Sequence, residues 1–303
     1  MNKTTFILSF ILVLFTNPYA HAEEDADSYL PVYHAPESFT EEMHISRGGQ
    51  LYDNWWGTTT DNHKPSGNHS LWRTQNTNKR SGYSTYRCKE CHGWDYLGKD
   101  GAYGKGSHYT GFVGVYNASR KMTAKELEAV LMGSTNRDHD FSMYLKDEDI
   151  SNLVLFMKMG IVESSIYIKA DGSSNGGNVN MGQEVYSKTC MTECHGPQGM
   201  AINFGDDKKP DFIGNIARKN PWEFIHKVRS GQPGTRMSSG IIFKMTDKEL
   251  RDLLAYSQTL PEKRPELGWF DKLKIKMGLV KKTLESPVLK EHRGFGPKLE
   301  QGL

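Results

Sequence analysis

The sequence predicts an all-α protein made of two similar helical domains in tandem, with loop-rich insertions. The first observation is a repeat, because G-Q-x-(x)-Y precedes a cysteine pair and a His-Gly dipeptide in each half. The second is a T-x-x-E capping box in each half, a signal for the start of a helix. The third is the composition: 24% charged and 37% hydrophobic residues with 30 glycines are typical of a soluble, globular chain.

The amino terminus predicts a secretory signal peptide over residues 1–22. Lys3 precedes a short apolar run, and Ala20 and Ala22 form a small-x-small cleavage site. The run is shorter than the roughly 20 apolar residues that span a bilayer, so an uncleaved membrane anchor is the less favoured alternative. We therefore expect the mature chain to begin near Glu23 and to reside in the periplasm.

The first domain is expected over residues 41–165. It opens on the helix containing G-G-Q-L-Y and then carries a polar, tryptophan-bearing insertion at about 53–87. After the first cysteine pair, the capping box T-A-K-E at 123–126 predicts a helix. A last helix is expected from Asp147, where apolar residues recur at helical spacing.

The second domain is expected over residues 181–262, with the same order of elements. Residues 170–180, A-D-G-S-S-N-G-G-N-V-N, have the composition of a flexible linker between the domains. Asn220 followed by proline predicts a capped helix start, and T-D-K-E at 246–249 predicts another. Residues 263–303 form a moderately basic tail.

The first cysteine pair has the spacing of a covalent haem attachment site. Two thiols must reach the vinyl groups on one edge of a porphyrin, and the next imidazole must reach its iron. Residues three apart share one face of a helix, so Cys88, Cys91 and His92 satisfy this requirement in a single turn. In an exported chain, C-x-x-C-H is typical of c-type haem.

The second pair has one residue too many, since three residues separate Cys190 from Cys194 before His195. The matching helix before it and the same trailing His-Gly indicate a second covalent haem c. The extra residue is then expected to form a local bulge in the attachment turn. Zinc is a weaker alternative because the two pairs are far apart, and a redox-active pair because no thioredoxin-like setting surrounds it. A structural disulfide within each pair would leave His92 and His195 without a purpose.

Each haem iron also needs a ligand on its second side. Met143 and Met237 follow their cysteine motifs in loops before the last helix of each repeat, and methionine with histidine is a standard pair of haem ligands. His139 lies four residues before Met143 and is the alternative ligand in the first domain. The sequence favours Met143 because it repeats the residue type of the second domain.

These residues resemble the class I c-type cytochromes, here as a fused di-haem protein, and the resemblance covers about residues 41–261. It implies helical domains that each hold a haem in a crevice with one edge exposed. Members of this family usually have a proline after the motif whose carbonyl group bonds the iron-binding histidine. Pro210 could act in this way in the second domain, whereas the first domain has no proline between Gly93 and Met143.

The favoured function is single-electron transfer in the periplasm, as a carrier rather than a catalyst. The expected partners are redox proteins: a dehydrogenase, an oxidase or another cytochrome. The alternative is a di-haem redox enzyme, similar to thiosulfate dehydrogenases or peroxidases, acting at one open or weakly ligated haem. A net charge of +2 gives no case for nucleic-acid binding, and membrane association through the basic tail has no direct support.

Overall fold

The computed structural model describes residues 40–264 apart from Asn62 and Asp207. The predicted signal peptide and all but the start of the predicted basic tail lie outside the described residues. Within them the chain is helical, as predicted, and the only β-type pairings are isolated bridges. The same residues contain no helix with both the length and the apolar character that a membrane span requires.

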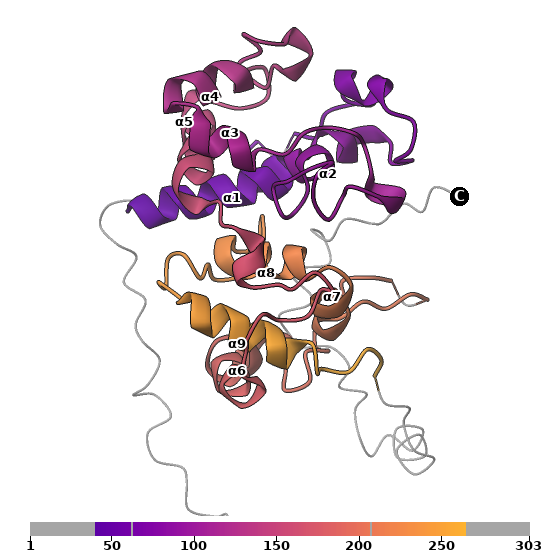
Figure 1. The fold of residues 1–303 in the computed structure, drawn as a ribbon, viewed down its shortest axis with the longest axis vertical. Coiled ribbons are helices and arrows are strands. Elements are labelled where there is room, and N and C mark those ends of the chain that lie inside the picture. The colour runs from indigo at the N-terminus through magenta and orange to yellow at the C-terminus, as the bar shows by residue number, and fades with distance from the viewer. Residues whose placement is uncertain (1–39, 62, 207, 265–303) are drawn as a thin grey trace, which may run out of the picture. The chain divides into compact units, whose positions relative to one another are not determined.

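The first half begins with one long helix and ends with a second helix packed against it (Figure 1). Between them lie short helices joined by loops. In chain order the α-helices are α1 (Glu41–Thr58), α2 (Cys88–His92), α3 (Tyr116–Lys121), α4 (Ala124–Leu131) and α5 (Asp147–Leu155).

The second half follows the same plan, with its first and last helices packed together (Figure 1). Its α-helices are α6 (Val179–Tyr186), α7 (Ile213–Lys219), α8 (Pro221–Ser230) and α9 (Asp247–Ser257). A π-helix, Ser187–His195, continues directly from α6 and carries the second cysteine pair.

The helix starts agree with the capping signals in the sequence. Thr123 and Glu126 form a complete capping box at α4, and Thr246 and Glu249 do the same at α9. The side chain of Asn220 accepts a hydrogen bond from the Glu223 amide at the start of α8. These bonds satisfy amide groups that a helix leaves unpaired in its first turn.

A glycine allows the first and last helices of each half to cross at close range. A Cβ atom on Gly48 in α1 would lie 2.0 Å from the carbonyl oxygen of Asn152 in α5. A Cβ atom on Gly182 in α6 would lie 1.9 Å from the carbonyl oxygen of Asp252 in α9. Real Cβ atoms do not approach oxygen so closely, so both crossings require glycine. Each crossing helps to enclose one of two separate hydrophobic clusters.

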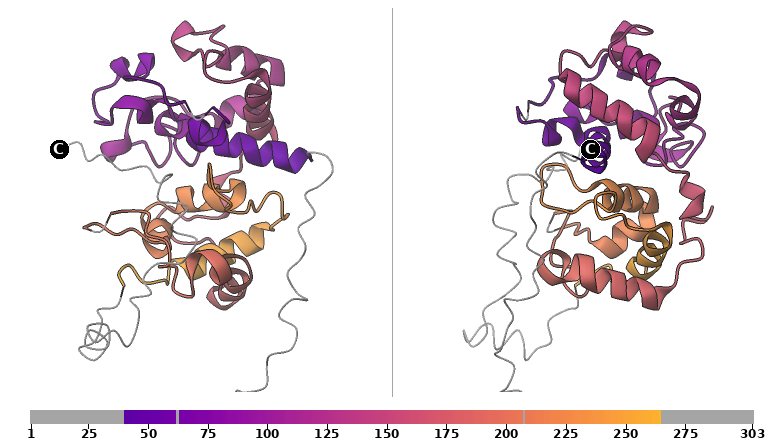
Figure 2. Two further views of the ribbon diagram at one scale, coloured as in Figure 1. Left: turned by 180° about the vertical axis from the view of Figure 1, so that it is seen from behind. Right: turned by 90° about the vertical axis from the view of Figure 1, so that its left-hand side faces the viewer.

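Helix α8 of the second half also contacts α1 of the first half (Figure 2). The hydroxyl of Ser46 donates to the carbonyl of Ser230 at 2.9 Å, and Lys227 lies 2.6 Å from the carboxylate of Asp53. The buried His226 ring bonds the Tyr96 hydroxyl at 2.8 Å and the Gly49 carbonyl at 3.0 Å. Polar contacts therefore join the two halves through buried groups.

Two segments differ in character from what composition suggests. Residues 170–180, expected as a flexible linker, are fastened to α9: the Ser174 hydroxyl bonds the Arg251 carbonyl at 2.7 Å, and the Asn178 amide bonds Asp252 at 2.7 Å. Helix α1 continues past a kink at Asn54, where the backbone is not helical, into the expected insertion as far as Thr58. Two tryptophans of this part are buried in the first hydrophobic cluster. Apolar burial explains why this part of the insertion is ordered helix.

Candidate haem-binding sites

The first cysteine motif forms a single α-helical turn. Helix α2 contains Cys88, Cys91 and His92, and it ends at Gly93, which has φ +77°. The amide of Gly93 donates to the carbonyl of Lys89 at 3.0 Å, the spacing of a regular α-helix. Both thiols are free and partly buried, and burial raises the pKa of Cys88 to about 12.

The second motif forms a wider turn. The amide of Gly196 donates to the carbonyl of Met191 at 3.0 Å, which closes a turn one residue longer than in the first motif. Lys89 and Met191 each follow the first cysteine of their pair, and Gly196 adopts φ +69°, like Gly93. The expected local bulge is thus a π-helix, which places more residues in each turn. The extra residue is spread over the turn rather than extruded from it.

The two motifs are held by the same contacts despite their different lengths. The hydroxyl of Tyr52 donates to the Gly93 carbonyl at 2.6 Å, and that of Tyr186 donates to the Gly196 carbonyl at 2.7 Å. Both tyrosines are buried. They belong to the G-Q-x-(x)-Y segments, so each first helix is tied to the residue after the candidate iron ligand.

The backbone after each histidine also turns in the same way. The amide six residues later bonds the histidine carbonyl, from Gly98 to His92 at 2.9 Å and from Ala201 to His195 at 3.1 Å. Within this turn Tyr96 has φ +66°, and Gly199 occupies the matching position with φ +69°. A bulky residue rarely adopts this conformation. Its place here fits the bond that the Tyr96 hydroxyl makes to His226.

A backbone carbonyl orients His92. Its Nδ1 atom bonds the carbonyl oxygen of Val113 at 2.7 Å, and an isolated bridge between Gly98 and Val113 brings that carbonyl into place. Val113 thus does in this half what the resemblance assigns to a proline. Burial, and after it the neighbouring His139, lower the pKa of His92 to about 4. The imidazole is therefore neutral near pH 7, with Nε2 available to bind a metal.

His195 lies in a drier and less bonded setting. Its side chain is buried, and its Nδ1 atom has no hydrogen-bond partner in the part of the chain that the structure describes. Burial lowers the pKa of His195 to about 4. Pro210 is exposed and makes no recorded bond to this ring, while the Phe204 ring lies 6.1 Å away, centre to centre.

The candidate ligands for the second side of each iron differ in placement. Met237 is partly buried and packs against the second hydrophobic cluster, which Cys190 also contacts. Met143 is 85% exposed. His139 instead lies beside the first motif, with its ring centre 6.2 Å from that of His92. The geometry of the first half favours His139 over Met143.

These donor sets fit a covalent haem at each motif. Each offers two free thiols and an imidazole with a lowered pKa on one helical turn, and a hydrophobic cluster lies alongside. Among residues 40–264, as far as they are described, no group of three or more His, Cys, Asp or Glu side chains is placed to hold a metal ion.

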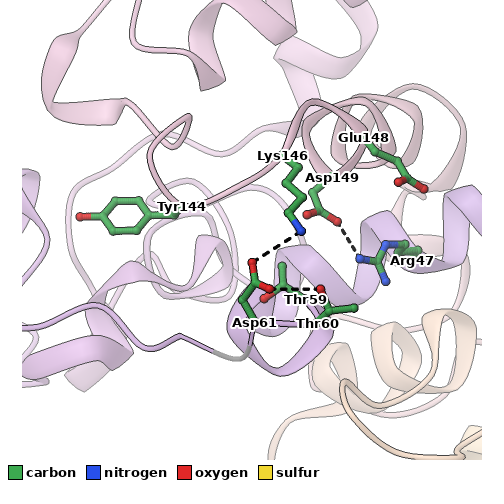
Figure 3. Close-up of a pocket in the computed structure, with 8 residues that line it drawn as sticks. All are labelled: Arg47, Thr59, Thr60, Asp61, Tyr144, Lys146, Glu148 and Asp149. Atoms are coloured by element: carbon green, nitrogen blue, oxygen red, sulfur yellow. Dashed lines mark hydrogen bonds and ion pairs between the residues drawn. The ribbon is translucent and has the colours of Figure 1, made fainter.

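A separate polar cavity of about 210 Å³ contains none of the cysteine-motif residues (Figure 3). Arg47 pairs there with Asp149 at 2.7 Å, and Lys146 pairs with Asp61 at 3.6 Å. The Tyr144 ring, which also lines the cavity, packs on Trp55 with ring centres 5.4 Å apart. The cavity lies among paired charges, and we assign it no part in haem binding.

Comparison with protein families finds a match in the second half. Residues 177–256 match the family model described as cytochrome c oxidase, cbb3-type, subunit III. The matched range contains α6, the second cysteine motif, α7, α8 and nearly all of α9. The chain matches none of the curated proteins and none of the solved structures with which it was compared. The match supports a c-type cytochrome with a haem-based electron-transfer function, and a cytochrome c domain implies covalently bound haem c.

Proposed function

We propose that this protein is a periplasmic di-haem c-type cytochrome that carries single electrons between redox partner proteins. The family match covers the second half, and one observation extends the proposal to the first half. Each tyrosine of a G-Q-x-(x)-Y helix bonds the carbonyl of the glycine that follows the motif histidine. The shared turn after each histidine supports the same conclusion.

Each half would hold its haem with the residues of its own motif. Cys88 and Cys91 would attach one haem through thioether bonds, with His92 as an axial ligand. Cys190, Cys194 and His195 would do the same for the other. Haem c supplies a one-electron change at iron when it is bound. All four cysteines are then used for attachment, and none remains as an iron ligand of the kind expected in a thiosulfate dehydrogenase-like enzyme.

The protein supplies rigid positioning and a hydrophobic cluster beside each site. The carbonyl of Val113 fixes the ring of His92 and increases the electron donation of its metal-binding nitrogen. The helix crossings at Gly48 and Gly182 hold the hydrophobic clusters beside the motifs. Such a site changes little in shape when an electron arrives or leaves, as a carrier requires.

The likeness to an oxidase subunit indicates the kind of partner. We propose that the protein serves as a subunit of an oxidase or dehydrogenase system, receiving electrons from one redox protein and passing them to another. Export would place these partners at the outer face of the cytoplasmic membrane. Cell fractionation and the mass of the mature chain test this: we expect a periplasmic protein that starts near Glu23, and a cytoplasmic, uncleaved chain would contradict export.

Intact-mass measurement of the purified protein tests the number of haems. We expect the mature chain plus two haem masses, and one haem fewer in each of the double variants Cys88→Ser/Cys91→Ser and Cys190→Ser/Cys194→Ser. Where a variant fails to accumulate, haem-bearing peptides of the unaltered protein give the same count. A single haem with free thiols at Cys190 and Cys194 would refute the di-haem assignment.

A further inference from the structure

The imidazoles of His92 and His139 lie next to each other, and each is bonded to a backbone carbonyl through Nδ1. His92 bonds the Val113 carbonyl through Nδ1 at 2.7 Å, and His139 bonds the Val130 carbonyl through Nδ1 at 3.2 Å. Each ring therefore has its Nδ1 atom occupied and its Nε2 atom left for another partner. A metal-binding histidine usually has this arrangement.

The spacing of the two rings agrees with this role. Their centres are 6.2 Å apart, and their planes are inclined by 74°, so the rings do not stack on each other. Two metal–imidazole bonds of about 2 Å, with about 1 Å from each ring centre to its nitrogen, give a separation of about 6 Å. The observed separation is therefore compatible with His92 and His139 sharing one metal ion.

The repeat independently makes His139 the counterpart of Met237. Gly133 is the second residue after α4 and Gly231 is the first residue after α8, with φ +73° and φ +82°. His139 and Met237 are each the sixth residue after that glycine. By the same count Met143 is four residues too far along the chain.

The residue two positions after each candidate ligand forms a hydrogen bond to an equivalent backbone carbonyl. The amide of Phe141 bonds the Leu131 carbonyl at 2.9 Å, and the hydroxyl of Ser239 bonds the Arg229 carbonyl at 2.6 Å. Leu131 and Arg229 each lie two residues before the matching glycine. His139 and Met237 therefore occupy equivalent positions in equivalent loops.

We propose that the two haem sites have different axial ligand pairs, His92 with His139 in the first half and His195 with Met237 in the second, and so different reduction potentials. This inference rests on the proposed function, since it requires a haem at each motif. A methionine ligand raises the potential of haem iron relative to a second imidazole. The first site is thus the low-potential site and the second the high-potential site.

The difference gives electron flow through the protein a direction. With a haem at each motif, His92 and His139 would hold the iron that gives up one electron, and His195 and Met237 would hold the iron that accepts it. No bond breaks and no proton moves. The donor protein therefore delivers its electron to the first half, and the acceptor protein collects it from the second half.

Optical and electron paramagnetic resonance spectra of the full di-haem protein test the ligand pairs. We expect two low-spin haems but only one methionine–iron charge-transfer band. Met237→Ala should abolish that band, and Met143→Ala should leave every spectrum unchanged. Met159→Ala, which alters another exposed methionine, serves as the matched control. Loss of a methionine band in Met143→Ala would overturn the proposal.

Redox titration tests the order of potentials. We expect two one-electron steps, with an upward shift of the lower step alone in His139→Met and a downward shift of the upper step alone in Met237→His. Two methionine bands, or a shift of the upper step in His139→Met, would refute the inference while leaving the di-haem function intact. A protein with one haem or none would instead refute the proposed function on which it rests.

Discussion

At the scale of single residues, backbone carbonyl groups accept several of the hydrogen bonds that position the candidate sites. Val113 and Val130 orient two histidines, and the carbonyls of Gly93 and Gly196 are each held by a tyrosine hydroxyl. A carbonyl group is present at every residue, so side-chain identity does not reveal which one is used. For this reason the sequence offered no means of finding Val113, whereas the cysteines and histidines were evident from their types and spacing.

Removal of one tyrosine hydroxyl tests these contacts. Tyr52→Phe and Tyr186→Phe should each lower the free energy of unfolding by about 1 kcal/mol, because the glycine carbonyl loses its hydroxyl donor and keeps only a backbone amide. Chemical denaturation of the holoprotein, followed by circular dichroism, measures the change. Tyr116→Phe is the control, since no hydrogen bond of its hydroxyl is recorded among the described residues. If all three variants were equally stable, the hydroxyl groups of Tyr52 and Tyr186 would not contribute to stability.

At the scale of helices and loops, the sequence predicted the order and the starts of the main elements. Capping boxes are local signals, so α4 and α9 begin where their threonines predict. The candidate ligand of the first half depends on register within a loop: Met143 matches Met237 in residue type, whereas His139 matches it in distance from the glycine. That distance was a usable signal in the sequence.

The attachment of residues 170–180 to α9 could not be predicted in the same way. Glycine, serine and asparagine have the composition of a flexible chain, yet Ser174 and Asn178 find partners on a helix that follows some 70 residues later. Local composition carries no information about such partners. A polar segment becomes ordered when the tertiary structure presents groups that satisfy its hydrogen bonds.

The helix crossings give a prediction at this scale. Gly48→Ala and Gly182→Ala should each destabilise the protein by about 3 kcal/mol, at the upper end for an overpacked contact, because the added methyl group meets a carbonyl oxygen. Thermal unfolding of the holoprotein measures the loss. Gly57→Ala in α1 is the matched control, since its Cβ atom would first meet the side chain of Asn54 at 3.0 Å. A loss as large in the control as in Gly48→Ala would show that the crossing is not responsible.

At the scale of the whole molecule, the two halves are joined through buried charge as well as apolar contact. Asp53 of α1 is fully buried and pairs with Arg87 of the first half and Lys227 of the second. Burial alone would raise the pKa of Asp53, but Lys227 and Arg87 outweigh it and hold that pKa well below its usual range. The ionised carboxylate therefore stabilises the contact between α1 and α8.

This carboxylate predicts a dependence of stability on pH. Because the pKa of Asp53 is lower in the folded chain than in the unfolded one, its contribution is complete above about pH 4 and is lost as the pH falls further. Asp53→Asn should lower the free energy of unfolding by about 3 kcal/mol at pH 7. The difference from the unaltered protein should narrow below about pH 4.

Denaturant titrations at pH 7 and pH 3 measure this difference. Asp61→Asn is the control, because Asp61 and its partner Lys146 are both 69% exposed and a surface pair contributes little. A constant difference between Asp53→Asn and the unaltered protein across this range would show that ionisation of Asp53 is not the cause.

The π-helix at Ser187–His195 bears on how such attachment sites can vary between proteins. A helix that widens over one turn admits an inserted codon without displacing the segments on either side, so the tyrosine before the motif still reaches the glycine after it. An insertion between the two cysteines is therefore compatible with the rest of the fold. A motif search that fixes the distance between the two cysteines would therefore pass over this segment.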